Sequence, residues 1–174
     1  MLFVVFREEE KRMRQVICFH NPEEENGFLS NWYLSEFWID EKRFSSMEQY
    51  MMYKKAELFQ DWEVAKKILE TNQAGKIKML GRSVKNYEDI IWNGVRQIIV
   101  YEGLLVKFGQ NEELKNKLLS TKDAVLAECA VRDCIWGIGL SMKDKRRFSL
   151  QEWKGKNLLG YTLMKVRDRL WLKN

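Results

Sequence analysis

Hydrophobic residues recur at spacings of three and four along most of the chain after Phe44. This periodicity places apolar side chains on one face of a helix. It predicts helices over residues 46–59, 61–70, 73–80, 88–108, 111–120 and 158–172. In the long segment 88–108, the residues that we expect to face the core are Ile91, Val95, Ile98 and Leu105.

Strand-like patterns are short and lie mainly near the N-terminus. Residues 15–19 predict a strand, and residues 37–44 predict a hairpin. The segments 124–127 and 134–136 fit either short strands or buried loops. No repeat, low-complexity segment or break in composition divides the chain. The sequence therefore predicts one predominantly helical α+β domain over residues 1–174, with a small β element in its N-terminal part.

Two charged residues interrupt the apolar face of the segment 46–59. At about 100° per residue, Glu48 and Lys55 fall on the same arc of this helix. The hydrophobic residues on that arc are Met51, Met52, Leu58, Phe59 and Trp62. The opposite face already carries Tyr53, Lys54, Glu57, Gln60 and Asp61. Two turns, roughly 10 Å of rise, separate the two charges, which suits an approach to one ligand from both ends.

Burial of an unpaired carboxylate or ammonium group costs several kcal/mol, so such groups are rarely buried without a partner or a role. Each of the two residues also has a structural alternative. Ser45-x-x-Glu48 fits a capping box, in which the glutamate reaches back to the backbone at the helix start. The stem of Lys55 could cover apolar surface while its amine reaches water.

The composition is that of a globular protein with an anionic partner. The 174 residues carry a net charge of +5, and 13% of them are aromatic. A phosphate ester, a nucleotide or a nucleic acid would suit this charge. The densest basic cluster, residues 143–147, is interrupted by Asp144, and we expect it to be a solvated loop. The apolar run 1–6 is too short to span a bilayer, so no membrane partner is expected.

The supply of metal ligands and nucleophiles is small. Cys18, Cys129 and Cys134 form no CxxC pair, and His20 is the only histidine. A zinc site and a Ser/His or Cys/His nucleophile are therefore disfavoured, and we expect no metal ion or cofactor. The odd number of cysteines and the lack of a secretion signal favour a cytoplasmic location. Catalytic chemistry would fall to carboxylates and amines.

An ordered series of motifs runs through the chain. The motifs are Phe28-x-Ser30-Asn31, Glu48-x-Tyr50 followed by Lys55, Gly81-Arg82, Trp92, Glu128 with Asp133-x-x-Trp136-Gly137, and Gly155-Lys156-Asn157-x-Leu159-Gly160-x-x-Leu163-Met164-x-x-Arg167. In this order they resemble the NADAR family, whose YbiA-like branch contains N-glycosidases that act on early riboflavin-biosynthesis intermediates. The resemblance covers about residues 19–170, and it implies a YbiA-like fold.

The sequence departs from this family in two places. The helix that usually begins with Ser-Glu-His has Met47 and Gln49 on either side of Glu48, and Met52 replaces a frequent glutamine. These positions bear on the shape of the base pocket. The segment 140–154 is longer than in the riboflavin branch, which would suit a bulkier ligand.

The resemblance implies hydrolysis of a bond between ribose C1′ and a nitrogen. A carboxylate opposite C1′ stabilises the positive charge of the transition state or activates water, while an acid protonates the leaving nitrogen. Glu48 is the first choice for the carboxylate and Asp133 is the second carboxyl group. Alternatively, a partly desolvated Lys55 amine condenses with C1′ of the opened sugar as a Schiff base. Both routes use Glu48 and Lys55, and both stay open.

The same motifs supply candidates for substrate binding. Arg82 and Lys156 are assigned to phosphate, Asn31 and Asn157 to hydrogen bonds with sugar or base, and Trp92 and Trp136 to stacking. Tyr50 and Gly137 complete this set through their places in the motifs. Two of them have structural alternatives, since Arg82 could be a surface residue beyond a helix end and Asn157 could cap the last helix.

Three functions are consistent with these residues. The leading one is a metal-independent N-glycosidase for ribosylamino-pyrimidine phosphates of riboflavin biosynthesis, with a small phosphorylated ribosyl compound as its substrate. The second is removal of ADP-ribose from guanine in DNA, which predicts salt-dependent DNA binding. The third is a non-catalytic module that binds ADP-ribose or a related nucleotide.

Overall fold

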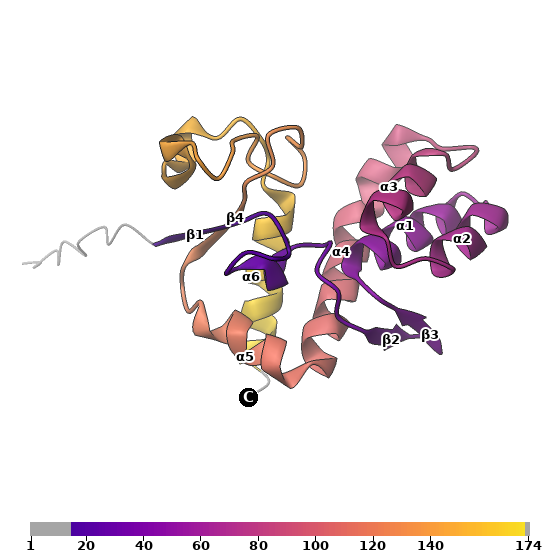
Figure 1. The fold of residues 1–174 in the computed structure, drawn as a ribbon, viewed down its shortest axis with the longest axis horizontal. Coiled ribbons are helices and arrows are strands. Elements are labelled where there is room, and N and C mark those ends of the chain that lie inside the picture. Colours follow the sequence, from indigo (N-terminus) through magenta and orange to yellow (C-terminus); the bar gives the residue numbers. More distant parts are fainter. Residues whose placement is uncertain (1–14, 173–174) are drawn as a thin grey trace, which may run out of the picture.

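The computed structural model describes residues 15–172 and shows a predominantly helical α+β fold (Figure 1). The helices in this range are α1 (Met47–Leu58), α2 (Trp62–Leu69), α3 (Ala74–Arg82), α4 (Asp89–Gln110), α5 (Glu112–Ser120) and α6 (Leu158–Trp171). The strands are β1 (Val16–Phe19), β2 (Phe37–Ile39), β3 (Lys42–Phe44) and β4 (Val125–Glu128). The predicted fold class is confirmed. The apolar run 1–6 lies outside the described residues, and none of the described helices is long and apolar enough to cross a membrane.

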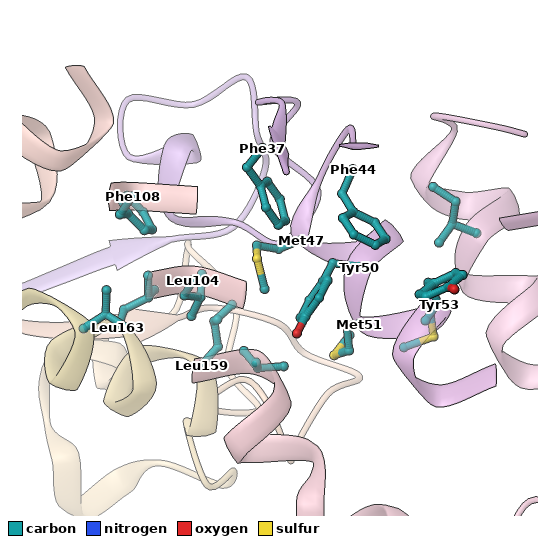
Figure 2. Packing of buried hydrophobic residues seen from close by; sticks show 14 of the residues in the cluster. Phe37, Phe44, Met47, Tyr50, Met51, Tyr53, Leu104, Phe108, Leu159 and Leu163 are labelled. Carbon is teal, nitrogen blue, oxygen red and sulfur yellow. The ribbon is translucent and has the colours of Figure 1, made fainter. Parts of the chain in front are cut away.

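The long helix α4 lies between two groups of elements (Figure 1). On one side α1 packs against α4, and α2 and α3 pack against α1. On the other side α6 packs against α4 and β4, and α5 packs against α4 and α6. Side chains from both sides meet in one hydrophobic cluster, with Met47 of α1 and Leu163 of α6 near Leu104 of α4 (Figure 2). This arrangement brings early and late parts of the chain to one central helix.

The strand β1 pairs in parallel with β4, although about 110 residues separate the two in the sequence. Phe19 is the register partner of Glu128, so Glu128 ends the pair. The segment 124–127, for which strand and loop were both open, is thus largely strand, whereas residues 134–136 form a turn. Asn157 fastens β4 from the side, because its Nδ2 donates to Leu126 O at 2.8 Å and its Oδ1 accepts from Glu128 N at 3.1 Å.

The hairpin β2–β3 forms at its predicted place. Asp40 and Glu41 adopt positive φ angles of 48° and 62°, as the tight two-residue turns of hairpins require. Phe37 and Phe44 are register partners with ring centroids 5.8 Å apart. The Tyr50 ring packs on both, at 6.0 and 5.1 Å (Figure 2). The hairpin therefore covers one side of α1 with aromatic rings.

Helix α1 is buried on nearly all sides, with nine of its twelve residues buried. The prediction of a polar face that includes Tyr53 was wrong, because Tyr53 packs edge-on against Phe44 at 5.5 Å. The predicted apolar arc also extends too far, since Leu58 and Trp62 are exposed. A helix enclosed by neighbours needs no polar face, and α1 is enclosed by α2, α3, α4 and the hairpin.

Helix α4 turns a different face to the core from the one predicted. Ile91 and Ile98 are 42% and 60% exposed, so their assignment to the core was wrong. Val95 and Leu105 are only partly buried against the core. The buried residues of this helix are Trp92, Arg96, Val100, Gly103, Leu104, Lys107 and Phe108. This buried face includes two cations, which the apolar pattern did not select.

The segment 140–154 folds over the β1–β4 pair rather than over α1. Leu140 belongs to a small cluster with Cys18 and Cys129, and Trp153 packs against it. Trp153 Nε1 donates to Arg147 O at 2.9 Å, which closes the segment on itself. The basic stretch within it is largely solvated, as predicted.

Candidate active site

A cavity of about 520 Å³ opens between α1, α3, α4 and the loop that follows β4. Glu48 and Lys55 of α1 both line it, although they are two turns apart in the helix. Trp32, Trp92 and Trp136 contribute aromatic walls. A carboxyl group and an amine thus meet in one concave site with rings beside them.

Glu48 is 4% exposed and does not cap its helix. The capping box is formed one residue later, because Ser46 Oγ accepts from Gln49 N at 3.2 Å and Gln49 Oε1 accepts from Ser45 N at 2.7 Å. Burial raises the pKa of Glu48 from its ordinary value of 4.5 to about 7, against the opposing charge of Lys78 and a hydrogen bond from Trp32. The Glu48 carboxyl group is therefore not used in helix capping; it lines the cavity and is close to its titration point at neutral pH.

Lys55 does not extend its amine to the solvent. The residue is 9% exposed, and its Nζ donates to Gly81 O at 2.7 Å. The same nitrogen lies 3.9 Å from the ring centroid of Tyr87. Burial lowers the pKa of Lys55, and the charge of Arg82 lowers it further, against the opposing effect of Asp89. A lowered pKa increases the fraction of neutral, nucleophilic amine.

Glu128 brings a second carboxyl group to the cavity. The residue is half-buried, but its Oε2 is fully buried and has no hydrogen-bond partner among residues 15–172. Burial raises its pKa to about 8, and the neighbouring charges of Asp133 and Glu48 raise it further. An unpaired, desolvated carboxyl group of this kind is typical of acids that transfer protons.

Asp133 lies beside these groups in a different state. It lines the cavity and is half-buried. Its Oδ1 accepts hydrogen bonds from Ile135 N at 3.0 Å and Trp136 N at 2.8 Å. This aspartate therefore shapes the turn after β4 with one oxygen, which leaves the other oxygen for the cavity.

A second cavity of about 540 Å³ adjoins the first. The residues that line both are Trp32, Lys78, Arg82, Glu128 and Asp133. The second cavity adds His20 and Arg132 but no residue of the segment 140–154. The segment 140–154, which would suit a bulkier ligand by its length, packs against the β1–β4 pair and lines neither of these two cavities.

Sequence comparison identifies the family of this chain. The NADAR domain model matches residues 18–171. The chain belongs to the NADAR family. The match includes every residue of the cavity and the whole described fold apart from its ends.

Relatives of this NADAR protein carry enzyme names. N-glycosidase R617 of Acanthamoeba polyphaga mimivirus is 41% identical over 80% of this chain and 85% of its own length. N-glycosidase YbiA of Escherichia coli is 28% identical over 89% of this chain and 88% of its own length. The NMR structure of YbiA matches with a TM-score of 0.77 and 27% identity, over 96% of this chain and 91% of that chain. Riboflavin biosynthesis protein VVA0006 of Vibrio vulnificus is 30% identical over 91% of this chain and 39% of its own length.

Five of the predicted substrate-binding residues of the NADAR protein line the first cavity. They are Asn31, Arg82, Trp92, Trp136 and Lys156. Asn31 is 6% exposed, and its buried Oδ1 has no partner in the described part of the chain. That oxygen is a ready acceptor for a ligand donor. Arg82 and Lys156 are exposed at the edge of the cavity.

The other three predicted binding residues lie elsewhere. Tyr50 is 2% exposed and packs on the hairpin, on the side of α1 away from the cavity. Asn157 is fully buried, holds β4 through the two hydrogen bonds described above, and makes no side-chain capping bond to α6. A Cβ atom on Gly137 would lie 2.8 Å from Glu128 O, so this glycine allows the turn to pack against β4.

Sequence reasoning missed several residues of the cavity. Glu128 belonged to a recognised motif but received no role, and Lys78, Arg96 and Trp32 received none. Glu128 could have been found from its position at the carboxyl end of a short apolar run. In sheets of parallel strands, ligands bind at the carboxyl ends of the strands. No pattern signalled Arg96, because a charged residue on a helix is usually solvated.

Proposed function

We propose that this protein is a metal-independent N-glycosidase that cleaves the bond between ribose C1′ and nitrogen in ribosylamino-pyrimidine phosphates. One observation carries the proposal: Glu48 and Lys55, both buried, line a single cavity together with the unpaired carboxyl group of Glu128. The names of R617 and YbiA support the activity, and the name of VVA0006 supports riboflavin precursors as the substrate class.

In the first route, the two glutamates divide the work. Glu128 has the higher pKa, about 8, and donates a proton to the leaving nitrogen as the electron pair of the C1′–N bond moves to it. Glu48, with a pKa of about 7, acts in its ionised form on C1′ or on the attacking water. Two carboxyl groups of which one is protonated and the other ionised can serve as acid and base in the same site. Glu128 thereby takes the role first assigned to Asp133.

In the second route, Lys55 attacks C1′ of the ring-opened sugar. The neutral amine forms a C1′–Nζ bond, the amino-pyrimidine leaves with a proton from an acid, and an imine remains. Water then adds to C1′, and the sugar is released as the amine is restored. The contact of Lys55 Nζ with Gly81 O fixes the position from which the amine acts. Glu48 and Glu128 move protons in this route as well.

The test is a pair of variants with a defined substrate. Wild-type protein should release free base from a ribosylaminouracil phosphate, and Glu48→Gln should lower kcat at least 10²-fold, a typical effect of losing an acid–base group. The affinity for the sugar phosphate should change little, because a catalytic group acts mainly on the transition state. Glu102→Gln, at an exposed position of α4, is the control. Binding without base release by the wild type would identify a binding module and overturn the proposal.

The second cavity favours one alternative function. A ribosyl monophosphate leaves this adjoining volume of about 540 Å³ unused, whereas an ADP-ribosyl group could extend into it past Lys78 and Arg82. Release of ADP-ribose from guanine in DNA would use that space. Both substrates should therefore be offered to the same preparation. Turnover of ADP-ribosylated DNA alone would replace the riboflavin precursor as the substrate.

A further inference from the structure

Arg96 of α4 is a buried cation in the wall of the first cavity. It is 8% exposed, and its buried Nε has no hydrogen-bond partner among residues 15–172. No ion pair or hydrogen bond of its guanidinium group occurs in the described part of the chain. The Cζ atom of Arg96 lies 5.9 Å from the ring centroid of Trp136.

Other buried cations are accommodated by the protein itself. Lys55 donates to Gly81 O, and Arg167 donates to Thr121 Oγ1 and Ala124 O. Lys107 donates to Phe28 O, and burial lowers its pKa to about 7, so it can lose its charge. An arginine cannot be deprotonated in a protein. Arg96 therefore keeps its charge in a buried site, which is costly unless an anion arrives.

The acids of the cavity do not compensate this charge. The cations that act on the pKa of Glu48 are Lys78 and Arg82, and the one that acts on Glu128 is Lys78. Asp89, on the same helix as Arg96, accepts from Tyr87 Oη at 2.6 Å. No acid among residues 15–172 forms an ion pair with Arg96, so the anionic group of a bound molecule could occupy that position.

The place of Arg96 separates it from the carboxyl groups. Glu128 and Asp133 lie where the two cavities meet, together with Lys78 and Arg82. Arg96 and its neighbour Trp136 line the first cavity alone, as does Lys156. An anionic group bound by Arg96 would therefore lie in the first cavity, away from its junction with the second.

We propose that Arg96, with Lys156 at the rim, binds the phosphate monoester of a five-carbon sugar phosphate. A guanidinium group can donate two parallel hydrogen bonds to phosphate oxygens. The ring of Trp136 supports the guanidinium group from the side. The identity of the sugar phosphate rests on the function proposed above, whereas the anion site itself does not. Arg82, which the sequence assigned to phosphate, belongs instead to the junction with the second cavity.

The test compares ribose 5-phosphate with ribose by isothermal titration calorimetry, so that no turnover is required. Wild-type protein should prefer ribose 5-phosphate, and Arg96→Met should reduce that preference roughly 10- to 100-fold, the equivalent of one charged hydrogen-bonded pair. Affinity for ribose itself should stay the same. Arg169→Met removes the same charge from an exposed position of α6 and should leave the preference intact.

Every outcome decides the proposal. If Arg96→Met does not fold, Arg96→Lys keeps a charge without the fork geometry and should show an intermediate loss of preference. Full preference in either folded variant overturns the proposal, and its loss in Arg82→Met alone moves the phosphate to the junction. If wild-type protein does not distinguish the two sugars, the phosphate site is wrong, whatever the base-release assay shows. If the preference is lost as expected but no base is released, only the N-glycosidase proposal fails.

Discussion

Replacement of Glu48 by glutamine should stabilise the protein at alkaline pH even though it removes activity. Glu48 has a pKa of about 7 in the folded protein, against an ordinary value of 4.5. A raised pKa means that the folded protein binds the proton of Glu48 more tightly than the unfolded chain does, so protonation stabilises the fold. This contribution is fully present below about pH 4.5 and is lost as the pH rises through 7. Glutamine has nearly the same shape and never ionises, so the variant does not suffer this loss.

The magnitude follows from the two pKa values. At about 1.4 kcal/mol per pKa unit, the difference between 4.5 and about 7 corresponds to about 3 kcal/mol. Less than about 1 kcal/mol of this is already lost at pH 5, and nearly all of it is lost at pH 8.5. The free energy of unfolding of Glu48→Gln relative to the wild type should therefore rise by about 2 to 3 kcal/mol between these pH values.

Urea unfolding at pH 5 and pH 8.5 measures this difference. With a slope of about 2 kcal/mol per molar urea, the variant should gain about 1 M in its midpoint relative to the wild type on going to the higher pH. Titrating groups that Glu48 does not affect cancel in the comparison, and Glu102→Gln should show no such gain. Glu128 adds to the gain in the same direction, because the Glu48 charge raises its pKa in the wild type and is absent from the variant. If the difference between Glu48→Gln and the wild type were the same at both pH values, the Glu48 carboxyl group would not be desolvated and its catalytic assignment would lose its basis.

Three further results are expected. Borohydride added during turnover should attach the sugar to Lys55 as a mass increase found by mass spectrometry; turnover without such an adduct would exclude the Schiff-base route. Tyr50→Phe should leave kcat/KM unchanged, because Tyr50 packs in the core, whereas Tyr50→Ala should lower the free energy of unfolding by about 3 to 5 kcal/mol; impaired binding in a stable Tyr50→Phe would contradict this placement. Asn157→Ala should cost about 1 to 3 kcal/mol in urea unfolding for each group left unpaired at Glu128 and Leu126, and an unchanged midpoint would refute this role.

The helices and the hairpin could be predicted because their signals are local. Periodicity located the six α-helices found in residues 15–172, and the turn at Asp40 and Glu41 located the hairpin. The pairing of β1 with β4 could not be predicted. Val16 and Val125 are about 110 residues apart, and neither strand has a sequence feature that identifies the other. A four-residue apolar run does not indicate which other strand it pairs with.

The inward face of α4 was misjudged for a physical reason. A search for apolar residues passes over a face that carries Arg96 and Lys107, and it selects Ile91 and Ile98 instead. The true face runs at helical spacing from Trp92 to Phe108 once the cations are admitted. The sequence thus misleads where a helix buries charged residues, here Arg96 in the wall of the cavity and Lys107 against Phe28 O.

The part of the candidate site that comes from a single helix could be predicted. Glu48 and Lys55 share a face of α1, so their convergence follows from helix geometry alone. Tyr50 is two positions from Glu48, about 200° around the helix, which explains its place on the opposite side. Glu128 and Asn157 meet only through the parallel strand pair and the start of α6, so their tasks depend on tertiary contacts.

The parallel pairing of β1 and β4 also affects how the protein is made on the ribosome. Glu48 and Lys55 emerge early, but Glu128 and the strand that carries it follow about 70 residues later. Contacts between distant segments form last, since the intervening chain must first be ordered. A nascent chain therefore carries Glu48 and Lys55 without the complete cavity around them until Glu128 and its strand have been synthesised.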